Sequence, residues 1–383
     1  MYNEGHTKLS TRSPSGRYTR SPSTPQARKK AKMNQEPIRV GIAGLGRSGW
    51  SIHAGLLSTL EEQYRVTAVV DADEGRRQEA VERFDCMAYT DYDELLNDPG
   101  VELVVVALPS HLHASASIAA LEKGKHVVCE KPMATSLEDA DRMIQAAADT
   151  GRVLTIFQQR RYQPEFIKVR EILSSGLLGR IVQIRVAASG FSRRWDWQTL
   201  QKFGGGSLNN TGPHFLDQAL QLYGPDYPDT IFCHLDRTLT LGDADDFVKI
   251  VFKGPNAPVV DIEISSCDAY PPETWHIQGT LGGLTGTPRE LRWRWVVPEE
   301  MPPRELDTRP TPDRSYNRDQ LTWHEETWTP PVDTRTAFQG FYRDLYATIR
   351  EGKPLAITPE SVRRVMWLQE ECHRLCPLPQ EIE

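Results

Sequence analysis

Short runs of aliphatic and β-branched residues alternate with longer segments of mixed polarity through the first half of the chain. The short runs predict strands at 38–43, 66–70, 101–108 and 126–129. The segments between and after them predict helices at 48–60, 74–84, 111–123 and 136–149. The run at 101–108 is almost entirely apolar, as expected for a parallel strand buried on both faces. Strands that alternate with helices of this length predict a doubly wound parallel sheet.

The second half of the chain has longer strand patterns and fewer helices. A helix is predicted at 164–174, and strands are predicted at 181–187, 230–235, 247–252, 259–265, 275–279 and 291–296. This succession predicts a large, mainly antiparallel sheet that helices cover on only one face. A stretch rich in proline, arginine and acidic residues at 298–335 should be a surface excursion, and two closing helices are expected at 338–350 and 359–375.

A glycine-rich loop, Gly44-Leu45-Gly46-Arg47-Ser48-Gly49, joins the first predicted strand to the first predicted helix. In a dinucleotide-binding loop the first glycine permits the turn, and the second lets the backbone approach the pyrophosphate. The third allows the helix to pack closely on the strand. The fold class is therefore α/β, with an N-terminal Rossmann dinucleotide-binding domain at 36–157. A C-terminal α+β domain with a large, mainly antiparallel open-faced sheet should follow at 158–383.

The second predicted strand ends at Asp71, which lies 22 residues after Gly49. A carboxylate at this place accepts hydrogen bonds from the adenosine ribose and repels the 2′-phosphate of NADP(H). NAD(H) is therefore the expected cofactor. Arg76 and Arg77 follow in the next helix and could reach a 2′-phosphate, so NADP(H) remains the less favoured alternative.

Two turns leave strands at the carboxyl edge of the predicted sheet, where ligands of such folds bind. The first turn contains Pro109, Ser110, His111 and His113. Either one of its histidines lines a nicotinamide pocket, or both are surface or capping residues. The second turn is Glu130-Lys131-Pro132, in which the proline restricts Lys131 to extended geometry. Burial beside a cationic nicotinamide would lower the pKa of Lys131 from about 10.4, which suits proton exchange near neutral pH.

A third candidate stretch begins with the triple glycine at 204–206 and continues to Asn210 and His214. The glycines predict a flexible turn, and a helix should start near Gly212. Asn210 and His214 are four residues apart, so their side chains can face the same way across one turn. A single histidine is more often structural, but one placed a turn from an amide after three glycines is a better site candidate.

Together these motifs resemble the glucose–fructose oxidoreductase, inositol dehydrogenase and rhizopine-catabolism (Gfo/Idh/MocA) family over about residues 36–376. The resemblance also rests on Arg161-Tyr162 before Pro164 and on the ending from Gly352 to Pro359. It implies a catalytic lysine and histidine at Lys131 and His214. It implies cofactor contacts from Gly44, Gly46, Arg47, Ser48, Gly49, Asp71, Arg76, Pro109, Ser110, His113, Glu130 and Lys131.

One position departs from the family pattern, because many members carry aspartate where this chain has Asn210. An asparagine can hydrogen-bond a hydroxyl group but cannot take a proton at neutral pH. Proton exchange would then involve Lys131 and His214, with Asn210 positioning a neighbouring hydroxyl. The expected substrate contacts are Arg161, Tyr162, Trp195, Trp197, Asn210 and His214, although the two tryptophans are equally expected to be buried against the sheet.

These inferences predict an NAD(H)-dependent oxidoreductase acting on a secondary alcohol or ketone of a sugar, glycoside or cyclitol. One alternative is an NAD-dependent glycosidase or lyase that oxidises a sugar carbon transiently. Another is a non-enzymatic dinucleotide-sensing regulator. The uncovered face of the second sheet is expected to be apolar, which favours self-association, so a homodimer or homotetramer is expected.

Charge is distributed unevenly along the chain. Residues 1–33 contain eight Lys or Arg and one acid, a net +7, so the formal total of −7 leaves −14 on the remainder. An acidic body argues against a nucleic-acid surface. The basic tail at 1–35 lacks the apolar content to pack and should be disordered. Its Arg28–Lys32 run is expected to be a solvated extension, with nucleic-acid binding or a localisation signal as the alternative.

Cysteine usage and hydropathy narrow the setting of the protein. The six cysteines are scattered and suggest no disulfide framework, which favours a reduced, cytoplasmic environment. Cys372 and Cys376 flank His373 but lack a second ligand pair, so no metal is expected. The apolar runs are much shorter than the ~20 residues that a membrane span needs, so no membrane association is expected.

Overall fold

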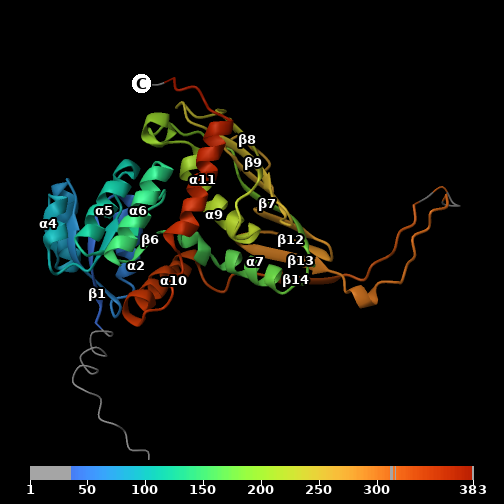
Figure 1. The fold of residues 1–383 in the computed structure, drawn as a ribbon, viewed down its shortest axis with the longest axis horizontal. Helices are drawn as coiled ribbons and strands as arrows, with labels where there is room; N and C mark the ends of the chain where they lie inside the picture. The colour runs from blue at the N-terminus through green and yellow to red at the C-terminus, as the bar shows by residue number, and fades with distance from the viewer. Residues whose placement is uncertain (1–35, 311–313, 315, 382–383) are drawn as a thin grey trace, which may run out of the picture. The chain divides into compact units, whose positions relative to one another are not determined.

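The structure is a computed structural model that describes residues 36–310, 314 and 316–381. The expectation of a disordered basic tail at 1–35 lies outside the described residues. From Pro37 onward the described residues form one compact unit that contains two sheets (Figure 1). None of the described helices combines the length and the apolar content that a membrane crossing requires.

The first sheet has six parallel strands in the order β3-β2-β1-β4-β5-β6. Its strands are β1 (Ile38–Ala43), β2 (Tyr64–Val70), β3 (Met87–Tyr89), β4 (Leu103–Val106), β5 (His126–Cys129) and β6 (Leu154–Ile156). Its main helices are α3 (Glu74–Phe84), α4 (Tyr92–Asn97), α5 (His113–Glu122) and α6 (Leu137–Thr150). The strand order reverses between β1 and β4, as in a doubly wound dinucleotide-binding sheet, so the Rossmann prediction is confirmed.

Several local features of this half differ from the sequence prediction. The helix expected at 48–60 is wound as a π-helix, η1 (Arg47–Ala54), and continues only through a short α-helical turn, α2 (Gly55–Leu57). The short elements β3, α4 and β6 were not predicted, because three to six residues are too few to show a period. The start of α6 is as expected, since the Ser136 hydroxyl accepts a hydrogen bond from the Asp139 amide at 3.1 Å.

The second sheet has eight strands in the order β14-β13-β12-β11-β7-β10-β9-β8, and only the β7–β10 pair is parallel. These strands are β7 (Ile181–Ser189), β8 (Thr230–Asp236), β9 (Phe247–Lys253), β10 (Val259–Ser265), β11 (Trp275–Gly279), β12 (Gly282–Thr287), β13 (Glu290–Trp295) and β14 (His324–Trp328). The mainly antiparallel sheet is therefore confirmed. The sequence patterns missed β12, which contains three glycines, and β14, which lies within the expected surface excursion.

Three helices cover one face of the second sheet: α7 (Pro164–Ser174), α9 (Gly212–Tyr223) and α11 (Pro359–Leu375) (Figure 1). Their apolar side chains join those of the strands in a common core. On the other face Lys249 bridges Asp261 at 2.6 Å and Glu263 at 3.1 Å. The expectation that the open face would be apolar is therefore wrong over the central strands, because their outward positions carry paired charges.

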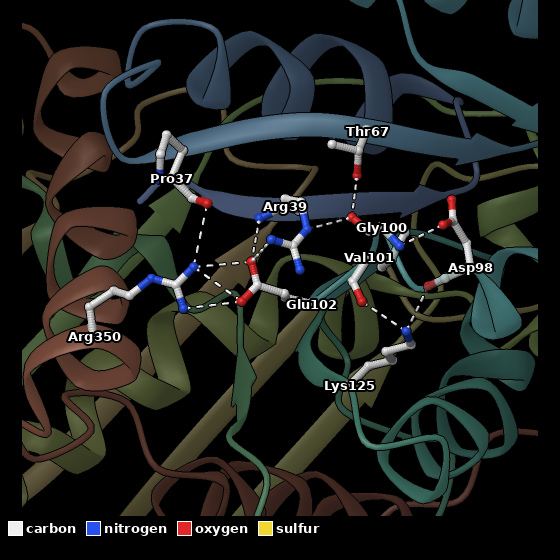
Figure 2. A network of polar contacts seen from close by, with 9 residues as sticks. All are labelled: Pro37, Arg39, Thr67, Asp98, Gly100, Val101, Glu102, Lys125 and Arg350. Atoms are coloured by element: carbon white, nitrogen blue, oxygen red, sulfur yellow. Dashed lines mark hydrogen bonds and ion pairs between the residues drawn. The ribbon is translucent and has the colours of Figure 1, made fainter. Parts of the chain in front are cut away.

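The chain returns to the first sheet after β14. Helix α10 (Thr334–Tyr346) places Phe341, Tyr342 and Leu345 in the core of the first sheet. The following turn, η7 (Ala347–Glu351), carries Arg350, whose guanidinium donates to the Glu102 carboxylate at 3.0 Å (Figure 2). The C-terminal segment is thus fastened to the part of the chain that contains the glycine loop.

The network around Glu102 lies at the amino-terminal edge of the first sheet, where its strands begin. Glu102 directly precedes β4, and Arg39 in β1 forms an ion pair with it at 3.4 Å. Lys125 donates to the carbonyl oxygens of Asp98 and Val101, both at 2.8 Å (Figure 2). Because ligands of such sheets bind at the opposite, carboxyl edge, this network holds the fold rather than a ligand.

Candidate active site

The three loop glycines meet different surroundings. Gly44 has φ +90°, and a Cβ atom there would lie 2.6 Å from the carbonyl oxygen of Ala107. A Cβ atom at Gly49 would overlap the carbonyl oxygen of Gly44, whereas one at Gly46 would have nothing within 4 Å. The first and third glycines are therefore needed for packing, and the second leaves backbone exposed. An open backbone at the start of a helix is suited to a pyrophosphate group.

Asp71 is tied to this loop by its side chain. One carboxylate oxygen accepts a hydrogen bond from the Leu45 amide at 2.7 Å, and the other accepts from the Asp73 amide at 2.9 Å. The Arg76 guanidinium lies 3.7 Å from Asp71, and Arg77 donates to the Asp71 carbonyl oxygen at 2.7 Å. An adjacent cavity of about 430 Å³ is lined by Val70, Asp71, Thr90, Tyr92, Leu108 and Leu112 among others. Its position and mostly apolar lining are suited to an adenosine group.

Lys131 follows β5 at the carboxyl edge of the same sheet. Its ammonium donates a hydrogen bond to the backbone carbonyl of Asn210 at 2.9 Å, which links the two candidate stretches. Burial lowers the pKa of Lys131, and the charges of Arg160 and Arg47 lower it further, while Glu130 opposes them. The direction agrees with the expectation for a lysine that exchanges protons. The peptide bond between Lys131 and Pro132 is cis.

His214 lies near the start of α9 and is almost completely buried. Burial holds the pKa of His214 well below its usual value, and the charges of Arg160 and Lys131 add to this effect. Its Nδ1 atom has no hydrogen-bond partner within the described part of the chain. A neutral imidazole with an unpartnered nitrogen beside Lys131 can bind a hydroxyl group.

Asn210 approaches Lys131 through its backbone rather than its side chain. It ends the short helix α8 (Ser207–Asn210), and Thr211 separates this helix from α9. The side-chain amide of Asn210 donates to the carbonyl oxygen of Gln198 at 3.2 Å. Helix α9 starts at Gly212, as predicted, so Asn210 and His214 lie in successive helices. The Asn210 carbonyl accepts from the Lys131 ammonium, whose charge also acts on His214.

Arg161 and Tyr162 are bound to other parts of the protein. Arg161 is buried, and its guanidinium makes two hydrogen bonds to the Asp217 carboxylate at 2.8 and 2.6 Å. The Tyr162 hydroxyl donates to Asp344 at 2.7 Å, and its ring packs against the first core. The hydrogen bonds of both side chains go to the framework, and their role as substrate contacts stays a prediction.

The neighbouring Arg160 was not identified from the sequence. Its guanidinium lies 5.0 Å from the centre of the Phe215 ring, and its charge acts on both Lys131 and His214. Two adjacent arginines point to different surroundings, and no sequence pattern indicates which of them faces the site. Both arginines lie in the η3 turn (Gln159–Tyr162), from which the Arg161 side chain reaches Asp217 in α9.

The two tryptophans lie at the surface. Trp195 is 75% exposed and Trp197 is 55% exposed, so the expectation that they are buried against the sheet is wrong. Trp197 makes an edge contact with the ring of Phe203, which is also exposed. An exposed aromatic pair just before the triple glycine is compatible with a sugar platform, and that role stays a prediction.

The remaining predicted cofactor residues lie around the same edge. Pro109 is exposed, and Ser110 begins a 3₁₀ turn, η2 (Ser110–Leu112), in the connection that follows β4. Arg47 is exposed and Ser48 is half-buried at the start of η1. Glu130 instead points inward, where His53 lies 3.1 Å from its carboxylate. Among the described residues, no group of His, Cys, Asp and Glu is arranged to hold a metal ion.

His113 is a buried clamp, while His111 is exposed. The Nδ1 atom of His113 lies 2.7 Å from the Pro132 carbonyl oxygen, and its Nε2 atom lies 2.9 Å from that of Leu108. Carbonyl oxygens only accept hydrogen bonds, so both contacts are satisfied only by the doubly protonated ring. Burial alone would lower the pKa of His113, but Cys129 and the two carbonyl groups hold it raised, at about 9.

His113→Leu should lower the free energy of unfolding more at pH 6 than at pH 10. A histidine whose pKa is raised on folding contributes stability that is fully present below about pH 6.5 and is lost as pH rises through about 9. The expected loss is about 2 to 3 kcal/mol at pH 6, measured by urea unfolding. His111→Leu is the exposed control and should change little at either pH. Equal losses for His113→Leu at both pH values would contradict a charged clamp.

Family models match both halves of the chain. Residues 38–158 match the model described as an oxidoreductase family with an NAD-binding Rossmann fold. Residues 166–285 match the model described as the GFO/IDH/MocA C-terminal domain.

The curated relatives include oxidoreductases and inositol dehydrogenases. An uncharacterised oxidoreductase from Schizosaccharomyces pombe is 28% identical over 343 residues, covering 82% of this chain and 89% of that protein. Inositol 2-dehydrogenase 2 from Saccharopolyspora erythraea is 29% identical, covering 79% and 89%. The NADP(+)-named scyllo-inositol 2-dehydrogenase IolW from Bacillus subtilis is 32% identical, covering 51% and 54%.

Solved structures share the fold at lower identity. The oxidoreductase YvaA from Bacillus subtilis has a TM-score of 0.74 at 22% identity, covering 89% of this chain and 96% of that one. The WlbA dehydrogenase from Chromobacterium violaceum, solved with NADH and UDP-GlcNAcA, has a TM-score of 0.71 at 20% identity, covering 89% and 94%.

Proposed function

The chain belongs to the Gfo/Idh/MocA oxidoreductase family, whose first domain is an NAD-binding Rossmann fold, and we propose that it is an NAD(H)-dependent dehydrogenase of a sugar, glycoside or cyclitol. The observation that carries this proposal is the half-buried Lys131, whose ammonium is held by the Asn210 carbonyl, together with the buried His214, whose Nδ1 atom has no partner among the described residues. Both lie beside the carboxyl edge of the sheet that carries the glycine loop. Relatives named inositol 2-dehydrogenase support a polyhydroxylated substrate.

The residues of the site divide the work between proton exchange and orientation. NAD bound along the carboxyl edge would supply the acceptor or donor of hydride. Lys131, held by the Asn210 carbonyl, would hydrogen-bond the reacting oxygen and exchange its proton. His214 offers its unpartnered Nδ1 to a neighbouring hydroxyl group. The amide nitrogen of Asn210 is held by Gln198, so its side-chain oxygen is the group that can accept from a second hydroxyl.

A substrate panel tests this proposal. Sugars, glycosides and cyclitols would be incubated with NAD⁺ while NADH absorbance is followed, and the reverse reaction would be tested with the matching ketones. Turnover that consumes a glycoside without net formation of NADH would favour the glycosidase or lyase alternative. Tight NAD(H) binding with no turnover of any compound class would favour the dinucleotide-sensing alternative.

The cofactor preference should follow Asp71. We expect NAD(H) to bind roughly tenfold or more tightly than NADP(H), because the carboxylate disfavours a 2′-phosphate by more than ~1.4 kcal/mol. Asp71→Ser should narrow this gap, since Arg76 then faces a 2′-phosphate without competition from the carboxylate. Calorimetric titration of both cofactors measures the effect. Equal binding to the unaltered protein would show that Arg76 already neutralises Asp71.

We infer that the protein forms a homodimer or homotetramer through the open face of the second sheet. The described helices that pack on this sheet cover the other face, and Phe232 and Val259 are exposed on the face that carries the outward charges. Light scattering at micromolar concentration should give at least twice the mass of one chain, and Phe232→Glu should shift the protein toward monomer. Replacing the exposed Leu306 by glutamate is a matched control, because that residue lies in the excursion between β13 and β14. A monomer for the unaltered protein would contradict the inference.

A further inference from the structure

A buried network of hydrogen-bonded side chains lies behind Lys131. The carboxylate of Glu130 lies 3.1 Å from Nε2 of His53, and Nδ1 of the same ring lies 2.6 Å from the hydroxyl of Tyr342. His53 and Tyr342 are completely buried. On the basis of the function proposed above, we propose that His53 and Tyr342 are positioning residues that hold Glu130, and through it Lys131, for proton exchange.

The protonation states in this network follow from its donors and acceptors. Burial would raise the pKa of Glu130, but the hydrogen bond from His53, together with Lys131, holds it below its usual value. The carboxylate only accepts, so Nε2 of His53 carries the hydrogen of that bond. Burial keeps the pKa of Tyr342 well above its usual value, so its hydroxyl remains protonated and can donate to Nδ1 of His53. A neutral His53 therefore satisfies both contacts.

Glu130 transmits this order to the reacting lysine. One of its oxygens faces His53, and the other accepts a hydrogen bond from the Lys131 amide at 3.0 Å. Its negative charge raises the pKa of Lys131, against burial and against the charges of Arg160 and Arg47. If Glu130 lost its donor, its carboxylate would no longer be held beside Lys131 and could turn away from it. The negative charge would then act on the Lys131 ammonium from a greater distance, and the pKa of Lys131 would fall further.

This network also joins parts of the protein that lie far apart in sequence. His53 belongs to η1, the helix that begins at the glycine loop, Glu130 follows β5, and Tyr342 belongs to α10. The Phe157 ring lies 4.3 Å from the His53 ring and limits its movement. Residues 47–54 are wound as a π-helix, a geometry found often at functional sites. The unusual winding therefore coincides with the segment that carries His53.

The test measures the titration of Lys131 directly. Reductive methylation requires the neutral amine, so its pH dependence at Lys131, followed by mass spectrometry, reports the pKa of that lysine without any need for turnover. His53→Leu should lower the titration midpoint of Lys131 by about one pH unit, because Glu130 loses its donor. His53→Gln should return the Lys131 midpoint most of the way to its value in the unaltered protein, since the glutamine amide can donate to Glu130. Tyr342→Phe should give a smaller shift in the same direction.

Tyr64→Phe is the matched control. The Tyr64 hydroxyl donates to the backbone carbonyl of Tyr342 at 2.6 Å, so this variant loses a buried hydrogen bond in the same core. It leaves the side-chain contacts of Tyr342 with His53 and of His53 with Glu130 in place, so the Lys131 midpoint should stay unchanged. A Lys131 midpoint unchanged by His53→Leu would overturn the proposal, and so would equal midpoint shifts in His53→Leu and Tyr64→Phe. If His53→Leu does not fold, Tyr342→Phe against Tyr64→Phe decides by the same criterion.

The outcomes also separate this proposal from the proposed function. A shifted midpoint in a protein that turns over no sugar or cyclitol would support the positioning role and reject the dehydrogenase assignment. An unshifted midpoint in a protein whose turnover depends on Lys131 would do the opposite. Where a substrate is known, the acid limb of the pH–rate profile for alcohol oxidation should move down by the same amount as the midpoint.

Discussion

Lys131→Ala is expected to lower kcat by ~10²- to 10⁴-fold, the range of a general acid–base contribution, while NAD(H) still binds. The lysine lies at the carboxyl edge of the first sheet, where its ammonium is held by the Asn210 carbonyl. The groups expected to bind the cofactor's phosphates and adenosine, the glycine loop and the cavity beside Asp71, are separate from it. Steady-state kinetics on a confirmed substrate and calorimetric NAD(H) titration would measure the two effects.

Lys131→Arg distinguishes proton exchange from charge alone. Arginine retains the positive charge but does not release its proton in this pH range, so it should also be strongly impaired. Lys123→Ala is a matched control, because that lysine is exposed and its ammonium donates to the side chain of Asn97, away from the site. Near-normal turnover of Lys131→Ala would reject the mechanism and favour the dinucleotide-sensing alternative.

The framework of the fold could be predicted because long elements carry clear periods. The predicted ranges of α3, α7, α11 and β5 coincide with the structure. β12 was not predicted because its glycines resemble those of a turn. Its strand geometry depends on pairing with β11 and β13. β14 escaped because its polar residues give no apolar alternation, so its pairing with β13 alone makes it a strand. Such tertiary effects lie outside any local window of sequence.

The site was predictable where a residue's role depends on its place beside a strand. Lys131 and Asp71 both follow parallel strands, so the topology alone places them at the ligand-binding edge. Residues that act through distant partners were not predictable in this way. His53 meets Tyr342 from 289 positions away, and Arg161 meets Asp217 from 56 positions away. Only the folded chain shows that Arg161 is paired with Asp217, while the charge of its neighbour Arg160 acts on Lys131 and His214.

Asp217→Asn should lower the free energy of unfolding by roughly 3 to 5 kcal/mol, the cost of leaving one partner of a buried ion pair unmatched. The Asp217 carboxylate receives two hydrogen bonds from Arg161, and both side chains are almost completely buried. Arg161 also donates to the Ser361 hydroxyl at 3.0 Å, so the pair joins α9 to the start of α11. Urea unfolding at neutral pH would measure the loss.

Asp139→Asn is the surface control for this pair. Asp139 lies 3.0 Å from Arg142 on an exposed stretch of α6, and such pairs contribute ~0–1 kcal/mol. Replacing Arg161 and Asp217 together by leucine should recover part of the loss, because no unmatched charge then remains buried. Since α9 carries both Asp217 and His214, Asp217→Asn should also reduce turnover under conditions where the protein is still folded. A loss below about 1 kcal/mol would show that water reaches the Arg161 guanidinium and that the pair behaves like the surface control.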